Sequence, residues 1–231
     1  MEYGSGSGFS GCFQAKAVFL GKGKRLMKET VKKVWKLIRS GKKTVSQETI
    51  GIIGTGRGVG ATHFTVMTAG YLGGVLRKRC AVLEWNSHGD FRNLRKLCEK
   101  EKAQTGCFQM LEADYYEKAG IDTLLLCKKS GYQAVIVDYG TVKEGSLEEF
   151  LRCDRQFVLG SLSEWQLEAF LEFERKGKKA EKSWKTLVSF GSEEARRNAE
   201  KRLNIPIARI PVSVDVFAVT GEIIGFYQQL L

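Results

Sequence analysis

The 231-residue sequence has no apolar run long enough to cross a bilayer and only two histidines. No stretch approaches the ~20 consecutive apolar residues that a membrane-spanning helix needs. The opening residues, MEYGSGSGFSGC, lack a basic region followed by an apolar one, so we do not expect a secretory signal. The two histidines, His63 and His88, are too few for most histidine-based metal sites.

The six cysteines show no CxxC spacing. Several stand in apolar stretches, as in 80-CAVLEW-85 and 124-LLLC-127. Scattered cysteines in apolar surroundings are typical of reduced, buried thiols rather than of a disulfide framework or a metal site. We therefore expect a cytoplasmic protein.

Positive charge is concentrated in one short segment. Residues 22–43 hold ten Lys or Arg and one Glu, so they carry nine of the eleven net positive charges. Three parts follow from this composition. We expect a flexible Gly/Ser-rich N-terminus over 1–23, a basic helical arm over 24–44 and a folded domain over 45–231.

The arm has the pattern of an amphipathic helix. Its apolar positions recur at helical spacing and leave a face rich in lysine. Such a helix can lie on an anionic membrane surface, bind nucleic-acid phosphates, or dock on the domain or a partner protein. A tryptophan at the edge of the apolar stripe favours a membrane or a protein over DNA. The residues expected to make this contact are Met27, Val31, Trp35, Ile38, Lys32, Lys33 and Lys36.

The rest of the chain alternates between short apolar, β-branched runs and helical patterns. Such alternation predicts a doubly wound α/β domain, with helices on both faces of a mostly parallel sheet. The segment 106–119 has no clear assignment. The predicted strands are 50–54, 81–85, 134–138, 156–160, 185–190 and 207–210, and the predicted helices are 61–78, 90–102, 121–130, 146–153, 163–176, 192–203 and 214–231.

A glycine-rich loop, 51-GIIGTGRGVGATHFT-65, joins the first predicted strand to the first predicted helix. A strand, a glycine-rich turn and a helix N-terminus together make an anion site, because backbone N–H groups and the helix dipole point at the ligand. Against the phosphate-loop pattern G-x-x-x-x-G-K-[ST], Gly60 and Thr62 fit. Ala61 replaces the lysine and Thr55 replaces the first glycine. A tight turn built for close packing and a dinucleotide-binding loop are the alternatives, the latter with poorer spacing.

Two strand ends add candidate site residues. Asp138 closes the apolar run 134-AVIVD-138, where a carboxylate can hold Mg²⁺ beside a phosphate loop. Glu84 and Asn86 lie where the strand 81–85 ends, and a carboxylate there can orient a water molecule. Both strand ends could instead make only turn hydrogen bonds. Together with the loop, they favour a lineage with a Mg²⁺ site.

Residues 49–231 resemble the MinD/ParA family of deviant Walker-A ATPases, and within it the TadZ/CpaE pilus-assembly branch. The family loop GKGGVGKT corresponds to 55-TGRGVGAT-62, its "VDxD" strand end to 83-LEWN-86 and its "IDxP" motif to 136-IVDYG-140. Two further tracts, 153-CDRQFVLGSLSEWQLEAF-170 and 203-LNIPIARIPVSVDVFAVTGE-222, follow in the family's order. The resemblance implies a P-loop NTPase fold and a homodimer formed across the loop face.

The departures from the family pattern concern the residues that carry charge. Gly56 stands where the family has the lysine that reaches across the dimer, and Ala61 stands at the second lysine. Asn86 stands at the water-orienting aspartate. The adenine-contacting asparagine has no clear match in 187-LVSFGS-192. Phosphoryl transfer depends on positioned charge, so the resemblance implies inefficient hydrolysis.

The remaining loop residues could still bind ATP or ADP weakly. Arg57 could contact phosphate, and Thr62 and Asp138 could hold Mg²⁺. The expected nucleotide-binding residues are Gly54, Gly56, Arg57, Gly58, Val59, Gly60, Ala61, Thr62 and His63. Three functions stay open: a scaffold or positioning component, a slow Mg-dependent ATPase, and a nucleic-acid partitioning protein.

Overall fold

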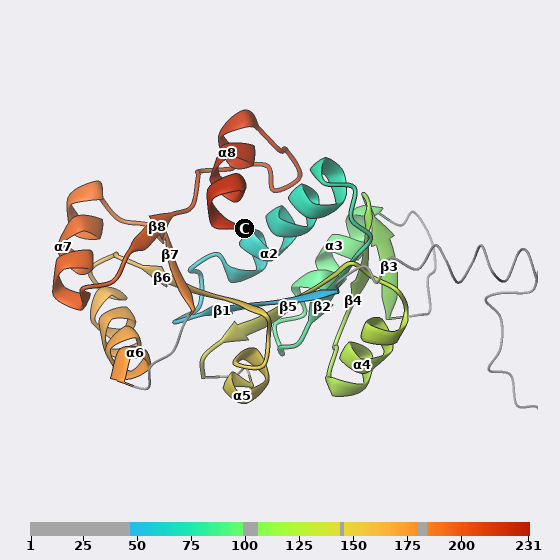
Figure 1. Cartoon of the computed structure of the whole chain (residues 1–231), viewed down its shortest axis with the longest axis horizontal. Helices are drawn as coiled ribbons and strands as arrows, with labels where there is room; N and C mark the ends of the chain where they lie inside the picture. The colour runs from blue at the N-terminus through green and yellow to red at the C-terminus, as the bar shows by residue number, and fades with distance from the viewer. Residues whose placement is uncertain (1–46, 99–105, 144–145, 180–183) are drawn as a thin grey trace, which may run out of the picture. The chain divides into compact units, whose positions relative to one another are not determined.

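The computed structural model describes residues 47–98, 106–143, 146–179 and 184–231. They form one sheet with helices on both faces (Figure 1). The predicted flexible N-terminus and the basic arm, including its contact residues from Met27 to Ile38, lie outside the described residues. The helix predicted for the arm therefore stays a prediction.

The sheet has eight strands in the order β3-β4-β2-β5-β1-β6-β7-β8. All neighbouring pairs are parallel except β3 and β4, which confirms the predicted doubly wound, mostly parallel sheet. The strands are β1 (Glu48–Gly54), β2 (Cys80–Glu84), β3 (Cys107–Met110), β4 (Ala113–Tyr116), β5 (Ala134–Thr141), β6 (Arg155–Ser161), β7 (Lys185–Phe190) and β8 (Ile207–Arg209).

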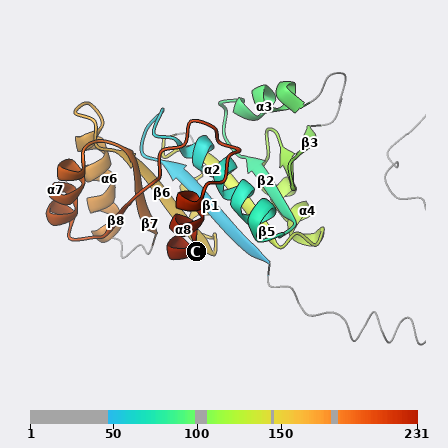
Figure 2. The ribbon, with the colours of Figure 1, turned by 90° about the horizontal axis from the view of Figure 1, so that it is seen from above.

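Helices enclose the sheet from both sides, as Figures 1 and 2 show. α2 (Ala61–Ala69), α3 (Asp90–Cys98) and α8 (Gly221–Leu230) pack against one face. α4 (Ile121–Lys129) and α5 (Leu147–Phe150) pack against the other. α6 (Leu167–Lys179) and α7 (Glu193–Leu203) form a separate apolar cluster beside β7. Within the described ranges no helix is long and apolar enough to span a bilayer.

Several element boundaries differ from the predicted ones. The helix predicted over 61–78 ends as α-helix at Ala69 and continues as a π-helix, η1 (Gly70–Val75). The unassigned segment 106–119 forms the β3–β4 hairpin, whose turn places Leu111 at φ 52°. The last helix starts at Gly221, because the Thr220 hydroxyl accepts a hydrogen bond from the Ile223 N–H at 3.3 Å.

The cysteines that the structure describes are free thiols. Cys80, Cys127 and Cys153 are buried, as predicted, and Cys107 is half-buried. Burial raises the pKa of the Cys80 thiol to about 12, so it behaves as a small apolar core group. The side chains of Cys12 and Cys98 lie outside the described part of the chain.

Candidate functional site

The glycine loop lies at the carboxyl edge of the sheet, directly after its interior strand β1. β1 pairs with β5 on one side and with β6 on the other. Strands β3, β4, β2 and β5 therefore lie on one side of β1, and β6, β7 and β8 lie on the other. In open α/β sheets, ligands bind outside the carboxyl ends of the strands at such a switch point.

Two glycines of the loop adopt left-handed backbone conformations. Gly58 has φ 73°, and Gly60, the N-cap of α2, has φ 92°. A side chain at either position would be strained, so glycine is required for this path. A Cβ on Gly54 would lie 2.7 Å from the Val59 side chain, which shows how closely the loop folds back on the end of β1.

The loop is held in place by long-range contacts. Val59 is 1% exposed and anchors the loop in the core. The Ser189 hydroxyl donates a hydrogen bond to the Val59 carbonyl at 2.9 Å, and the Gln166 side-chain amide donates one to the Arg57 carbonyl at 2.9 Å. The loop is therefore held by β7 and by the residue that precedes α6.

Above the loop lies a cavity of about 290 Å³. Every predicted nucleotide-binding residue except Gly54, which is buried beneath the loop, lines it. Arg57 is the one lining side chain, among the described residues, with a permanent positive charge. Desolvation lowers the pKa of His63, which keeps this ring neutral near pH 7. The full lining is Gly56, Arg57, Gly58, Val59, Gly60, Ala61, Thr62, His63, His88, Asp90, Gly140 and Thr141.

Asp138 lies inside β5 rather than at its end, because the strand continues to Thr141. Its side chain is fully buried. Oδ1 accepts a hydrogen bond from the Gly140 N–H at 2.9 Å, and Oδ2 has no hydrogen-bond partner among the described residues. Burial raises the pKa of this carboxyl, although the Thr62 hydroxyl and the Gly140 N–H act in the opposite direction. An orphaned buried carboxylate oxygen beside a threonine hydroxyl fits a Mg²⁺ ligand pair.

Glu84 lies next to Asp138 in the sheet register but does not line the cavity. It is 1% exposed, and its Oε1 accepts a hydrogen bond from the Phe91 N–H at 3.0 Å. Burial raises the pKa of this carboxyl. Glu84 therefore caps the start of α3 and is not placed to orient a water molecule in the cavity.

Asn86 is also turned away from the cavity. Its amide nitrogen donates to the Asp138 carbonyl at 3.1 Å, and its amide oxygen accepts from the His88 N–H at 2.9 Å. The side chain thus holds the β2–α3 connection against β5. Both ends of the amide are engaged by backbone, which leaves it poorly suited to orient a nucleophile.

Four cavity residues were not predicted as site residues: His88, Asp90, Gly140 and Thr141. They follow β2 or form the end of β5, two neighbouring strands of the sheet. The Asp90 Oδ2 atom lies 3.4 Å from the Thr62 hydroxyl, which donates to it, and 4.0 Å from the His88 Nδ1 atom. The polar run 86-NSHGD-90 was the available signal, since it directly follows a buried strand.

Two further cavities adjoin the loop. One of about 330 Å³ shares Gly60 and His63 with the loop cavity and is lined mainly by apolar residues of α2, β7 and the segment after β8. The other, about 320 Å³, shares Gly56 and Arg57 and contains Lys143 and Trp165. A phosphate group would fit the loop cavity, and a flat base would fit the apolar cavity.

Comparison with protein-family models finds no match, and neither does comparison with curated proteins. Solved structures do match. A putative plasmid partition protein from Borrelia burgdorferi B31 bound to AMPPNP is 12% identical, with a TM-score of 0.57 over 80% of this chain and 100% of that one.

MinD from Aquifex aeolicus, in a MinC:MinD cell division complex, is 17% identical with a TM-score of 0.56, over 72% of this chain and 82% of that one. The septum site-determining protein MinD from Pyrococcus horikoshii OT3, complexed with Mg-ADP, is 13% identical with a TM-score of 0.53, over 71% and 81%. Together with the strand order and the position of the glycine loop, these matches show that the described part of the chain has a P-loop NTPase-like fold, similar to the folds of MinD and of the plasmid partition protein.

Proposed function

We propose that this protein is a positioning or scaffold component of a larger assembly, whose glycine loop binds Mg-nucleotide weakly and hydrolyses it little or not at all. The observation that carries the proposal is the lining of the loop cavity. Its shape suits phosphate, with two left-handed glycines and the N-terminus of α2. Among the described residues that line it there is no lysine.

Thr62 and Asp138 are the residues that would hold Mg²⁺. The Thr62 hydroxyl lines the cavity, and the unpartnered Oδ2 atom of Asp138 lies behind it. Mg²⁺ is commonly bound by one or two protein oxygens together with phosphates, and when bound it would offset the phosphate charge. Asn86, at the water-orienting position, would contribute nothing to hydrolysis because its amide is hydrogen-bonded to backbone.

A slow Mg-dependent ATPase is the alternative, and Arg57 favours it. Its guanidinium lines the loop cavity and could take over part of the role of a lysine. Turnover of Mg-ATP by purified full-length protein separates the two functions. We expect the wild-type rate to equal that of Asp138→Ala, and a rate well above this control would establish the ATPase instead.

Self-association across the loop face is the second part of the proposal. Trp165 is 82% exposed and lines the adjoining cavity of about 320 Å³, together with Arg57 of the loop. Tryptophan and arginine are enriched at the energetic centres of interfaces. We expect sedimentation velocity with Mg-ATP to detect a dimer that Trp165→Ala weakens, while a sedimentation coefficient equal in both proteins would argue against this face.

Residues 24–39 of the basic arm are proposed to attach this cytoplasmic protein to the inner face of a membrane or to a protein partner. Several lysines near an anionic surface contribute about 1 kcal/mol each. Replacing Lys32, Lys33 and Lys36 by Glu in the full chain should abolish binding to vesicles that contain phosphatidylserine. Unchanged vesicle binding would remove the membrane role, and salt-sensitive DNA binding without vesicle binding would favour the partitioning function.

The resemblance to the TadZ/CpaE branch makes a pilus or secretion apparatus the proposed assembly. That placement follows from the quoted motifs and not from the fold. Identifying the proteins that copurify with the full chain, and their loss from the lysine variant, would test it.

A further inference from the structure

Asp90 lies at the loop cavity, and its carboxylate is not needed to cap α3. It is the first residue of α3, and the preceding capping position is Gly89, which has no side chain to accept a hydrogen bond from the helix. Here Glu84 performs that task from β2, by accepting the Phe91 N–H at 3.0 Å. The Asp90 side chain is 49% exposed and lines the cavity.

Asp90, at the start of α3, and Asp138, in β5, both approach the Thr62 hydroxyl. The Thr62 Oγ1 atom lies 3.4 Å from Asp90 Oδ2, and it also interacts with the Asp138 carboxyl. Asp138 is fully buried, and its Oδ2 atom has no partner within the described residues. Two carboxyl groups and one hydroxyl therefore converge on the side of the loop where phosphates would lie.

This arrangement gives the cavity an unfavourable charge for a bare polyphosphate. Against the two carboxyl groups, Arg57 supplies the one permanent positive charge among the cavity's described lining residues. A divalent cation between the carboxylates and the phosphates would reverse the repulsion.

We infer that Asp90 is a cation-binding residue of the loop cavity. With Thr62 and Asp138, it holds a divalent cation such as Mg²⁺ that enters together with nucleotide phosphates and offsets their repulsion from the two carboxylates. The inference rests on the proposed nucleotide binding. The described residues contain no group of three His, Cys, Asp or Glu suited to a metal, so phosphate oxygens must complete the coordination.

The position of Asp90 also accounts for the departure at Asn86. Three residues lie between the two, and the connection turns so that Asn86 faces the backbone of β5 while Asp90 faces the cavity. A carboxylate absent from one position of the β2–α3 connection is thus present at another. Its contact with Thr62 suits binding of a cation rather than orientation of a water molecule.

Calorimetric titration of the full-length protein with ATP, in Mg²⁺ and in EDTA, tests the inference. For the wild type we expect Mg²⁺ to tighten ATP binding about tenfold or more, as a charge-assisted contact of this kind would. Asp90→Asn should lose most of that gain and should bind ATP in EDTA more tightly than the wild type. Asp122→Asn, a matched loss of one carboxylate in the first turn of α4, should behave as the wild type.

Each outcome separates this inference from the function on which it rests. If Asp90→Asn keeps the full gain from Mg²⁺, Asp90 does not bind the cation, although the loop still binds nucleotide. If the wild type binds ATP equally in Mg²⁺ and EDTA, the cation site is wrong. If it binds ATP in neither, both the nucleotide site and the role of Asp90 are overturned.

Discussion

At the scale of one residue, Ala61 combines a backbone that suits phosphate with a side chain that carries no charge. It begins α2, lines the loop cavity and is half-buried. The preceding Gly60 keeps the left-handed conformation that turns the chain into the helix. The backbone conformation that suits phosphate is therefore present, although the side chain at position 61 carries no charge.

Ala61→Lys should strengthen phosphate binding, because the lysine can enter a cavity of about 290 Å³ from the start of α2. We expect ATP affinity in Mg²⁺ to rise about tenfold, the scale of one charge-assisted contact. Calorimetry measures the change. Gln109→Lys adds the same charge at an exposed position of β3, and three strands lie between β3 and β1. This variant should bind ATP as the wild type does. An equal affinity in Ala61→Lys and the wild type would show that the loop does not cradle phosphate.

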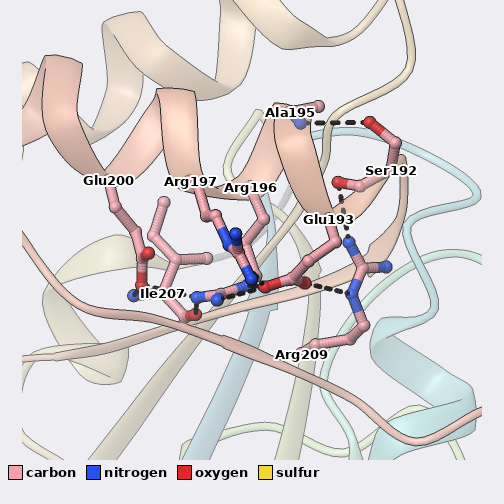
Figure 3. A network of polar contacts seen from close by, with 8 residues as sticks. All are labelled: Ser192, Glu193, Ala195, Arg196, Arg197, Glu200, Ile207 and Arg209. Carbon is pink, nitrogen blue, oxygen red and sulfur yellow. Dashed lines mark hydrogen bonds and ion pairs between the residues drawn. The ribbon is translucent and has the colours of Figure 1, made fainter.

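At the scale of elements, α7 protects the open edge of the sheet. β8 has three residues and pairs only with β7 in the described sheet. The Arg196 Nη1 atom donates to the Ile207 carbonyl at 2.8 Å, and Glu200 Oε1 accepts from the Ile207 N–H at 2.9 Å (Figure 3). The two side chains also pair with each other. Backbone groups at an exposed edge are thereby satisfied by the neighbouring helix.

Arg196→Ala should release this edge. The side chain is 20% exposed, and its loss removes the donor to the Ile207 carbonyl and the ion pair with Glu200, neither of which water fully replaces at a half-buried site. We expect a loss of roughly 2 kcal/mol in the free energy of unfolding, and faster amide exchange over β8. Arg197→Ala, on the same helix but 69% exposed, is the matched control and should change little. Equal exchange over β8 in both variants would contradict the role given to Arg196.

The sequence allowed the central elements to be predicted more closely than the peripheral ones. β1, β2, β6 and β7 are continuous apolar runs, because helices cover both faces, and such runs can be recognised locally. The β3–β4 hairpin has no clear sequence signal, since its four-residue strands have the short alternating pattern of a sheet edge. The start of α8 was misplaced, because the apolar residues before Thr220 pack without helical structure.

At the candidate site too, features that lie within one stretch of sequence could be predicted, and contacts between distant segments could not. The glycine loop is contiguous in sequence, so the residues from Gly56 to His63 could be predicted and do line one cavity. Asp90 reaches that cavity only through the turn after β2, and Asn86 is drawn away from it by the backbone of β5. Contacts between segments 52 residues apart cannot be read from spacing alone.

For the molecule as a whole, buried carboxyl groups make stability depend on pH. Burial raises the pKa values of Glu84, Asp138 and Glu174. A carboxyl group whose pKa is higher in the folded than in the unfolded protein binds more protons when folded. Each of these groups therefore lowers the free energy of unfolding as the pH rises from about 4, the unfolded value, through its folded pKa.

Glu174 allows this dependence to be measured away from the loop. It is 2% exposed, and it accepts hydrogen bonds from Trp184 Nε1 and from the Thr186 hydroxyl, both at 3.0 Å. In Glu174→Gln, the amide oxygen can accept from Trp184 and the amide nitrogen can donate to Thr186. The substitution thus removes the buried charge and can keep both contacts.

Glu174→Gln should therefore become more stable relative to the wild type as the pH rises from about 4 to about 7. Urea unfolding followed by tryptophan fluorescence at each pH gives the difference in free energy of unfolding. Glu172→Gln on the same helix is the control with the opposite sign, because the ion pair with Lys176 at 2.7 Å lowers the pKa of Glu172. A difference between Glu174→Gln and the wild type that stays constant or shrinks with pH would show that burial does not penalise the Glu174 charge.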